Sequence, residues 1–562
     1  MNRARFLGLS LSSLAASTPF TFGQESAPCR CCALTRFYAP YIKDLPAPPF
    51  REGIGNSQMK ISTKSKVAQK WFNQGLNLLH AFWEFEAYRA FLQAAEADPD
   101  CAMAYWGIGM SLPGKDPEAK EERNAALEKA LELSANNPAP EKHYIQALEQ
   151  LVALGPKKAA EVFRTYLKES PNDPEATAFL SFWLRDGNTP DGAPKKGTQE
   201  GLKLLDDALK KHPKHVGLHH YRIHLLETGP NFLGALDSAL LLPEAAPNAP
   251  HLVHMPGHIF YLQGNYPAAV EIFKLSRRVE EAYLNGEKIP AIDSPNYLHN
   301  LHFLSFAAVE CGKIDLALEA ATSFASITIP PERLAAIGAG QTNYLARQMV
   351  PLVHARLGEF EEAAKLIRFD DLPPESPPRI LFEGFQTYFN LRARFAKEEL
   401  PRIELLKAKL NFDQIINRFK KARPIKLTVT NRMPYQTSLV ILDLLAMELA
   451  AFFEAPTASD DSLTLKMEIS SEKQHRLAYI EPPFLPWCLE ERFGDLWITR
   501  GNKKEAAKWY QLALKRRPTS GHILLRLARA TGLKKDYQDF LMAWEEADGN
   551  RPELAEARGA IK

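Results

Sequence analysis

The chain of 562 residues is poor in several features that would point directly to a function. It has six cysteines, too few for disulfides to be its main stabilising element. Its 69 basic and 67 acidic residues leave a net charge of +2, which gives no reason to expect nucleic acid or an anionic membrane as a partner. We find no apolar run of the roughly 18 residues that a membrane-spanning helix needs, and we predict no transmembrane segment.

Signature motifs of common enzymes are missing as well. The sequence contains no G-x-S-x-G nucleophile turn, no phosphate-binding glycine loop and no C-x-x-C-H haem attachment. Catalytic residues are therefore unknown at this level. No long alternation of apolar and polar residues is present either, whereas helical spacing runs through most of the chain, so we predict an all-α fold.

The N-terminus has the order of residues that is typical of a secretory signal peptide. Arg3 and Arg5 precede the apolar stretch Phe6–Leu14, and small residues follow at 15–17. We predict a signal peptide at 1–23 and export to the periplasm or the cell exterior.

A leader rich in proline and cysteine is predicted to follow at 24–60. Three cysteines, Cys29, Cys31 and Cys32, stand close together in it. A local disulfide, pairing with other cysteines of the chain and a thiolate metal clip are all compatible with this spacing. The role of these cysteines stays open.

The most informative positive feature is a repeat that includes histidines. His220 and His224 recur as His254 and His258, and Pro213 recurs as Pro247, all at one constant offset (254 − 220 = 34). A period of about 34 residues is typical of solenoids built from helix-turn-helix units. Eight of the fifteen histidines lie between His219 and His302, so stacking of the repeats should gather them on one surface.

The first repeat explains how such units pack. Gly75 and Ala87 are small enough to let two antiparallel helices approach, Phe91 fills the space between repeats, and Pro99 ends the second helix. This pattern resembles the tetratricopeptide repeat. The chain is therefore predicted to be an α-solenoid of stacked helix-turn-helix repeats.

The same register continues with one interruption. Gly312 and Ala317 follow Gly264 and Ala269 at a larger offset (312 − 264 = 48), so one repeat carries an insertion (48 − 34 = 14), which we place around 280–297, near the histidines. We predict repeats with a histidine-lined groove at 61–368, a helical segment with irregular loops at 369–434, and a C-terminal helical region with a final repeat at 435–562.

Several strings resemble a poorly characterised family of exported bacterial tetratricopeptide-repeat proteins. They are FNQGL at 72–76, DPDCAMAYWG at 98–107, HMPGHIF at 254–260, HNLHFL at 299–304 and EPP at 481–483. The family's usual FNH is FWE at 82–84 here. The resemblance implies a solenoid whose first helices line a concave groove for a peptide or protein ligand, and it implies no particular reaction.

The histidines fall on matched faces of three successive first helices, because residues three, four and seven apart share one face of a helix. The residues on these stripes are His220, His224, Glu227, His251, His254, His258, His299 and His302. Neighbouring helices pack at about 8–10 Å, so imidazoles of adjacent stripes can reach a shared ion, or two ions. We take all eight as candidate metal ligands.

Imidazole with carboxylate suits a transition metal such as Zn, Cu, Fe or Ni. Glu227 is a ligand, an orienting partner or a general base in this hypothesis. One interpretation is a binding or scaffold protein whose groove carries the cluster. The other is a metal-dependent enzyme, hydrolytic or oxidative. A groove that binds a peptide without metal also accounts for the pattern.

Other candidates are weaker. His219 lies one position off its stripe, and we expect it to pack between repeats. His80 is a lone histidine with the same expectation. We interpret the apolar stripe of Met103, Trp106 and Met110 as core, and that of Cys488, Glu491 and Asp495 as a solvated acidic face.

Overall fold

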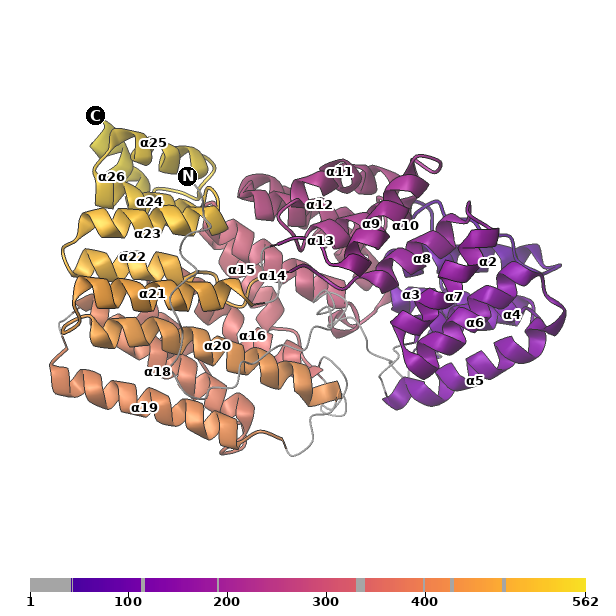
Figure 1. The fold of residues 1–562 in the computed structure, drawn as a ribbon, viewed down its shortest axis with the longest axis horizontal. Coiled ribbons are helices and arrows are strands. Elements are labelled where there is room, and N and C mark those ends of the chain that lie inside the picture. The colour runs from indigo at the N-terminus through magenta and orange to yellow at the C-terminus, as the bar shows by residue number, and fades with distance from the viewer. Residues whose placement is uncertain are drawn as a thin grey trace.

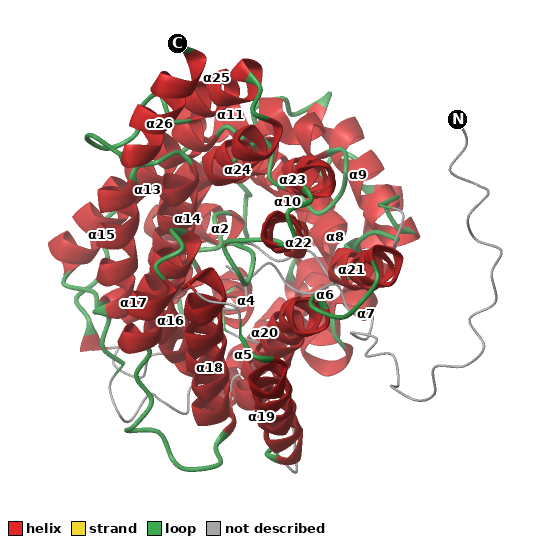
Figure 2. Cartoon of the chain, turned by 90° about the vertical axis from the view of Figure 1, so that its left-hand side faces the viewer, coloured by secondary structure: helices red, strands yellow, loops and turns green. Residues whose placement is uncertain are grey.

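The fold is known from a computed structural model, which describes residues 42, 44–112, 117–189, 192–329, 339–397, 400–424, 429–477 and 482–562. This part of the chain forms 25 α-helices, α2 to α26, and no β-strand (Figure 2). The predicted all-α class is confirmed. The predicted signal peptide at 1–23 and the three leader cysteines lie outside the described residues.

The helices follow one another in antiparallel pairs (Figure 1). In the first half they are α2 Lys66–His80, α3 Glu84–Ala97, α4 Ala102–Ser111, α5 Pro117–Leu133, α6 Ala139–Leu154, α7 Pro156–Glu169, α8 Pro174–Leu184, α9 Lys196–Leu209, α10 Val216–Leu226, α11 Leu236–Ala245, α12 Pro250–Gln263 and α13 Tyr266–Glu287. In the second half they are α14 Pro295–Glu310, α15 Ile314–Ala325, α16 Ala339–Arg356, α17 Phe360–Leu366, α18 Pro377–Lys397, α19 Arg402–Lys421, α20 Val429–Glu454, α21 Asp460–His475, α22 Leu489–Thr499, α23 Lys503–Arg516, α24 Gly521–Thr531, α25 Lys534–Ala543 and α26 Pro552–Ile561.

Within three of these pairs, a glycine on the first helix faces an aromatic ring on the second, at the same separation along the chain. The pairs are Gly75 with Phe91, Gly257 with Phe273 and Gly494 with Tyr510, where a Cβ atom on the glycine would lie 2.7, 2.2 and 2.4 Å from the ring. The close approach explains why no larger residue fits there. The packing that the sequence predicted for the first repeat therefore recurs along the solenoid.

Two large hydrophobic clusters run through the array and meet inside α12. One extends from Ile42 to Ile259 and the other from Tyr261 to Ala530. In Figure 1 the indigo and magenta helices α2–α8 lie at one end, the orange and yellow helices α18–α26 at the other, and α10, α12 and α14 between them. The histidine-bearing helices thus occupy the junction of the two clusters.

The predicted insertion lengthens α13 to 22 residues and adds a short 3₁₀ turn, Ala291–Asp293, before α14. The end of α13 reaches back to the first repeat. Tyr283 donates to a carboxylate oxygen of Glu86 at 2.8 Å, and Arg89 donates to Glu287 at 2.9 Å. The second helix of one repeat therefore makes contacts with a repeat that is distant in the chain, beyond its sequence neighbours.

Contrary to expectation, one helix is long and apolar enough to span a membrane. Tyr435–Glu454, within α20, has the length and composition of a spanning helix, and 56% of the tested stretch is buried in the fold. Its buried Glu448 accepts hydrogen bonds from Tyr388, Arg392 and Trp487. Many of its apolar side chains belong to the larger hydrophobic cluster, which accounts for the apolar character of this helix.

Candidate metal centre

The candidate ligands form two groups of three imidazoles. His220 and His224 of α10 join His251 of α12, and we call these three the first triad. His254 and His258 of α12 join His299 of α14 to form the second triad. Within each triad the three ligand nitrogen atoms all lie within 4.8 Å of one another.

Both triads are enclosed, which corrects the prediction of an open groove. The six imidazoles are between 0% and 4% exposed. The ring of Phe82 lies against His220 and His224, and the ring of Phe303 lies against His254 and His258. The histidine stripes face the interior because aromatic side chains from neighbouring elements cover them.

Hydrogen bonds to Nδ1 fix the tautomers in the first triad. His220 donates from Nδ1 to the backbone carbonyl oxygen of His80. His251 donates from Nδ1 to Asn296 Oδ1 at 3.0 Å, and Asn296 is oriented by its own donation to Glu280 at 2.6 Å. With the proton on Nδ1, Nε2 of each ring is left as a lone pair.

The second triad is built in the same way. His254 donates from Nδ1 to Asn300 Oδ1 at 2.7 Å. The amide of Asn300 donates to the backbone carbonyl oxygen of Phe273 at 2.8 Å, so Oδ1 is the acceptor toward the histidine. A hydrogen bond from the distal ring nitrogen to a carbonyl or carboxylate is the usual support of a metal-ligating histidine.

One carboxylate serves both triads. His224 donates from Nδ1 to Oε1 of Glu227 at 2.6 Å, and His258 donates from Nδ1 to Oε2 at 2.9 Å. Burial raises the pKa of a carboxyl, but the two histidines outweigh it and hold the pKa of Glu227 below its ordinary value. Of the three roles left open for Glu227, the geometry favours that of an orienting partner.

Lone pairs consequently face one another inside each triad. Nε2 of His220 lies 2.9 Å from Nε2 of His224, and Nε2 of His254 lies 2.6 Å from Nε2 of His258. Nε2 of His251 is buried with no hydrogen-bond partner. Burial lowers the pKa of His220 and His254 well below the ordinary value, so these two rings are acceptors at Nε2.

The spacing fits a bound cation. Two nitrogen ligands at Zn–N distances of about 2.0–2.1 Å in tetrahedral geometry stand about 3.3 Å apart. The corresponding separations are 2.6 to 2.9 Å within the i, i+4 pairs and 3.3 Å between His258 and His299. An ion at either triad would require the two rings of the i, i+4 pair to move apart by about 0.4 to 0.7 Å.

Two residues of the predicted stripes do not belong to the triads. His302 is not brought together with the six imidazoles, and its ring packs against Phe306 and Phe324. Glu227 accepts hydrogen bonds from His224 and His258, and it is not a member of either triad. His219 packs as expected, with Nδ1 at 2.9 Å from Ser238 Oγ.

Sequence reasoning missed the residues that orient the rings. Asn296 and Asn300 lie on the same helix as His299, four apart from each other, and asparagines next to histidines are a signal that could have been used. Phe82 has a left-handed backbone with a φ of 53°, unusual for a bulky residue, and nothing in its sequence surroundings announces this.

A second histidine network lies next to the first triad. Glu175 accepts from Nε2 of His80 at 2.5 Å and from Nε2 of His215 at 3.0 Å. Ser57 Oγ lies 3.3 Å from the same His215 nitrogen. Because Nδ1 of His215 accepts from the backbone N–H of Leu218, its proton is on Nε2, and His215 cannot take a proton from Ser57. This network is structural.

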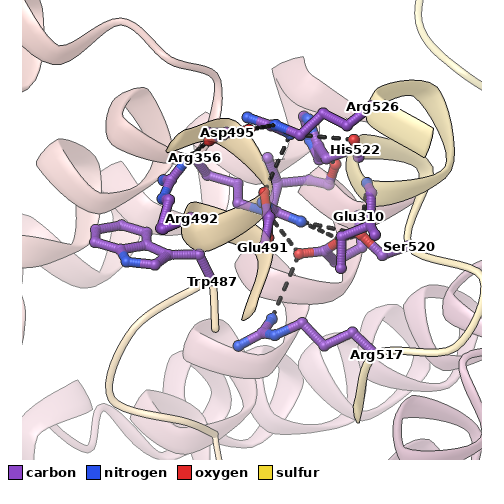
Figure 3. A network of polar contacts seen from close by, with 12 residues as sticks. Glu310, Arg356, Trp487, Glu491, Arg492, Asp495, Arg517, Ser520, His522 and Arg526 are labelled. Atoms are coloured by element: carbon purple, nitrogen blue, oxygen red, sulfur yellow. Dashed lines mark hydrogen bonds and ion pairs between the residues drawn. The ribbon is translucent and has the colours of Figure 1, made fainter. Parts of the chain in front are cut away.

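The stripe of Cys488, Glu491 and Asp495 is not a solvated acidic face. Cys488 and Glu491 are buried, and Glu491 pairs with Arg356, which also forms a two-pronged ion pair with Glu310 at 2.8 and 2.9 Å (Figure 3). We call this group, with Arg517 and Arg526, the Arg/Glu network. The stripe of Met103, Trp106 and Met110 belongs to the core, as expected.

Comparison with known proteins adds nothing to the all-α class that the helices themselves define. No protein-family model matches the chain, and no curated protein matches it. Solved structures that match include a human IFIT1 dimer with m7Gppp-AAAA, at 13% identity and a TM-score of 0.32, covering 88% of this chain and 91% of that one. The Cut9–Hcn1 complex of APC/C matches at 10% identity and a TM-score of 0.29, covering 88% and 90%. At such scores the likeness carries no inference about ligands.

Proposed function

We propose that this protein is an exported repeat solenoid that binds two transition-metal ions, one at each triad. The donors are neutral imidazole nitrogens in both cases, which suit Zn, Cu or Fe. The solenoid itself would serve as a binding scaffold for a peptide or protein ligand on its concave surface. Shared support from Glu227 would couple the affinities of the two sites.

The pairing of lone pairs at Nε2 carries this proposal. Four nitrogen atoms, in two pairs, lie 2.9 and 2.6 Å apart with their protons committed to acceptors on the other side of each ring. Two acceptor nitrogens that approach one another this closely in a buried site repel each other. A cation between them removes the conflict.

Elemental analysis of protein purified without a histidine tag tests the proposal. We expect two equivalents of Zn, Cu or Fe per chain, and one equivalent after His254→Ala combined with His258→Ala. The matched control is His219→Ala, on the face of α10 that bonds to Ser238, which should keep both ions. Protein that holds no metal, and whose thermal stability does not change with a chelator, would falsify the proposal.

A metal-dependent enzyme, hydrolytic or oxidative, is the second candidate. The observation that favours it is a small pocket next to His251, because catalytic metal sites keep one position open for water or substrate. Turnover of hydrolysable and oxidisable substrates by protein loaded with each metal tests this candidate. Loss of turnover in the double histidine variant, with retention in His219→Ala, is the expected pattern.

Export is part of the proposal and is tested separately. The expected observation is a mature chain in the periplasmic or extracellular fraction that begins near residue 24. An intact N-terminus in the cytosolic fraction contradicts it.

A further inference from the structure

Each triad is in contact with one phenyl ring that touches all three of its imidazoles. For the first triad the ring is that of Phe82, whose centroid lies 4.5, 5.2 and 5.5 Å from those of His220, His224 and His251. For the second triad it is that of Phe303, at 5.5, 4.7 and 4.9 Å from His254, His258 and His299. Each triad therefore has an aromatic cover of its own.

The cover of the second triad is held firmly. Phe303 lies in the middle of the continuous helix α14 and is 1% exposed. Its ring also packs against the rings of Phe273 and Tyr261, at 5.1 and 5.3 Å between centroids. In such close packing the ring cannot leave the triad unless α14 or its neighbours move as well.

The cover of the first triad lies in a short turn instead. Phe82 is the central residue of the 81–83 turn between α2 and α3, it is 9% exposed, and its φ of 53° is costly for a bulky side chain. Backbone N–H groups of Phe82 and Trp83 donate to Leu79 and Leu78 of α2, at 3.1 and 2.9 Å, and keep the turn closed. The turn also lines a cavity of about 20 Å³, so it is not closely packed on every side.

The residue before this turn supports a ligand of the first triad. The backbone carbonyl oxygen of His80, the last residue of α2, accepts the hydrogen bond from Nδ1 of His220. Displacement of the turn would therefore uncover the imidazoles and disturb the support of one of them together. In the second triad, His254 and His258 are supported by Asn300 of α14 and by Glu227, which are not part of this turn.

We infer that the 81–83 turn is a gate, which opens to let a metal ion enter and leave the first triad, while the ion at the second triad is retained. The inference rests on the proposed function and adds to it that one of the two ions exchanges and the other stays. A strained turn opens locally at a smaller cost in free energy than the middle of a packed helix. The ion that the protein exchanges with its surroundings is then the one behind Phe82.

Release kinetics test the inference. Protein loaded with two equivalents of Zn²⁺ is mixed with excess 4-(2-pyridylazo)resorcinol, whose absorbance reports each ion that leaves. We expect two phases of equal amplitude, with rates that differ by at least about tenfold. The variant with His254→Ala and His258→Ala should show the fast phase alone, which assigns that phase to the first triad.

Phe82→Ala removes the ring of the gate. It should accelerate the fast phase about tenfold and leave the slow phase unchanged. Uptake of Zn²⁺ by the first triad should become faster as well, because a gate limits passage in both directions, whereas a merely weakened site would only release faster.

Phe303→Ala is the matched control, since it makes the same truncation in the cover of the other triad. It should leave the fast phase unchanged. Phe82→Leu is the alternative gate variant if Phe82→Ala does not fold. It keeps an apolar side chain in the turn and should accelerate both uptake and release to a smaller extent.

The outcomes separate the two claims. Protein that binds no Zn²⁺ overturns the proposed function, and the inference falls with it. Release of both ions in a single phase overturns the inference alone. So does a Phe82 variant that folds and binds two ions but takes up Zn²⁺ no faster than the unmodified protein.

Discussion

The candidate metal centre and the Arg/Glu network are both buried polar clusters, and both include residues of α14. In the network, Arg356 lies between Glu310 and Glu491, and all three side chains are 0% exposed. Arg517 and Arg526 add further positive charge beside the same carboxylates. The centre instead gathers six imidazoles around a single carboxylate, Glu227.

The difference lies in what each cluster lacks. Opposite charges satisfy one another in the network, so it needs no additional component to be stable in a low-dielectric interior. The metal centre instead directs ring nitrogens of neighbouring histidines at one another, at 2.9 and 2.6 Å. Burial alone therefore does not identify a binding site, whereas the balance of donors and acceptors does.

The largest expected effect is on the network. Arg356→Met removes the positive charge between two buried carboxylates and should lower the free energy of unfolding by about 3–5 kcal/mol. Urea unfolding measures this. The control Arg347→Met breaks an ion pair whose Asp371 is 63% exposed and should cost less than about 1 kcal/mol. Equal costs for the two variants would contradict the closed-network interpretation.

Metal removal is the corresponding test of the centre. A metal present at a hundredfold excess over its dissociation constant should stabilise the fold by about 2.7 kcal/mol for each of the two sites. Unfolding with and without a chelator measures the difference. The His254→Ala, His258→Ala variant should lose the part of this stabilisation that comes from the second triad. Arg356→Met should retain the full stabilisation by metal.

Glu227→Gln should lower metal affinity about 10- to 100-fold at both sites, because the amide supports the two Nδ1–H groups less well than a carboxylate. Competition with a chromophoric chelator gives both dissociation constants. Glu175→Gln is a close control, since Glu175 is also buried and also bridges two histidines, but outside the triads. If Glu175→Gln lowers metal affinity to a similar extent, Glu227 affects the folding of the protein and not the two sites specifically.

The smallest effect concerns pH and His522, which lies in the network. Burial, followed by the charge of Arg356, lowers the pKa of His522 to about 3. The unfolded chain, with a pKa near 6.5, then binds more protons below that pH, so stability falls as the pH drops from about 6.5 toward 3. At pH 5.5 the loss should be about 1.4 kcal/mol relative to His522→Gln, referenced to pH 7.5. Parallel pH profiles for the two proteins would contradict this.

The sequence predicts the solenoid and the gathering of six of the eight candidate residues, since both follow from the period of the repeat and the period of the helix. It does not predict which imidazoles belong to which triad. His251, His254 and His258 lie on one face of α12, yet His251 joins α10 while the other two join α14, which depends on how three helices pack. His302 shares a stripe with His299 but packs against Phe306, because α15 covers that side.

Burial of the centre was unpredictable for a similar reason. The cover includes Phe82, which belongs to the first repeat and contacts His220 and His224 from far away in the sequence. Local patterns carry no information about such contacts. Likewise, the backbone carbonyl of His80 that accepts from His220 is a feature of tertiary structure.

The long helix α13 has a consequence for the unfolding of the array. In a solenoid whose repeats touch only their neighbours, the ends can fray while the middle stays folded. Here Glu287 is tied to Arg89, and Tyr283 to Glu86, so α3 and α13 are held together across the repeats between them. Opening any repeat in that stretch strains this tie. The segment that includes α10 and α12 should therefore unfold as one cooperative unit, and hydrogen exchange in these helices should be uniform and slow.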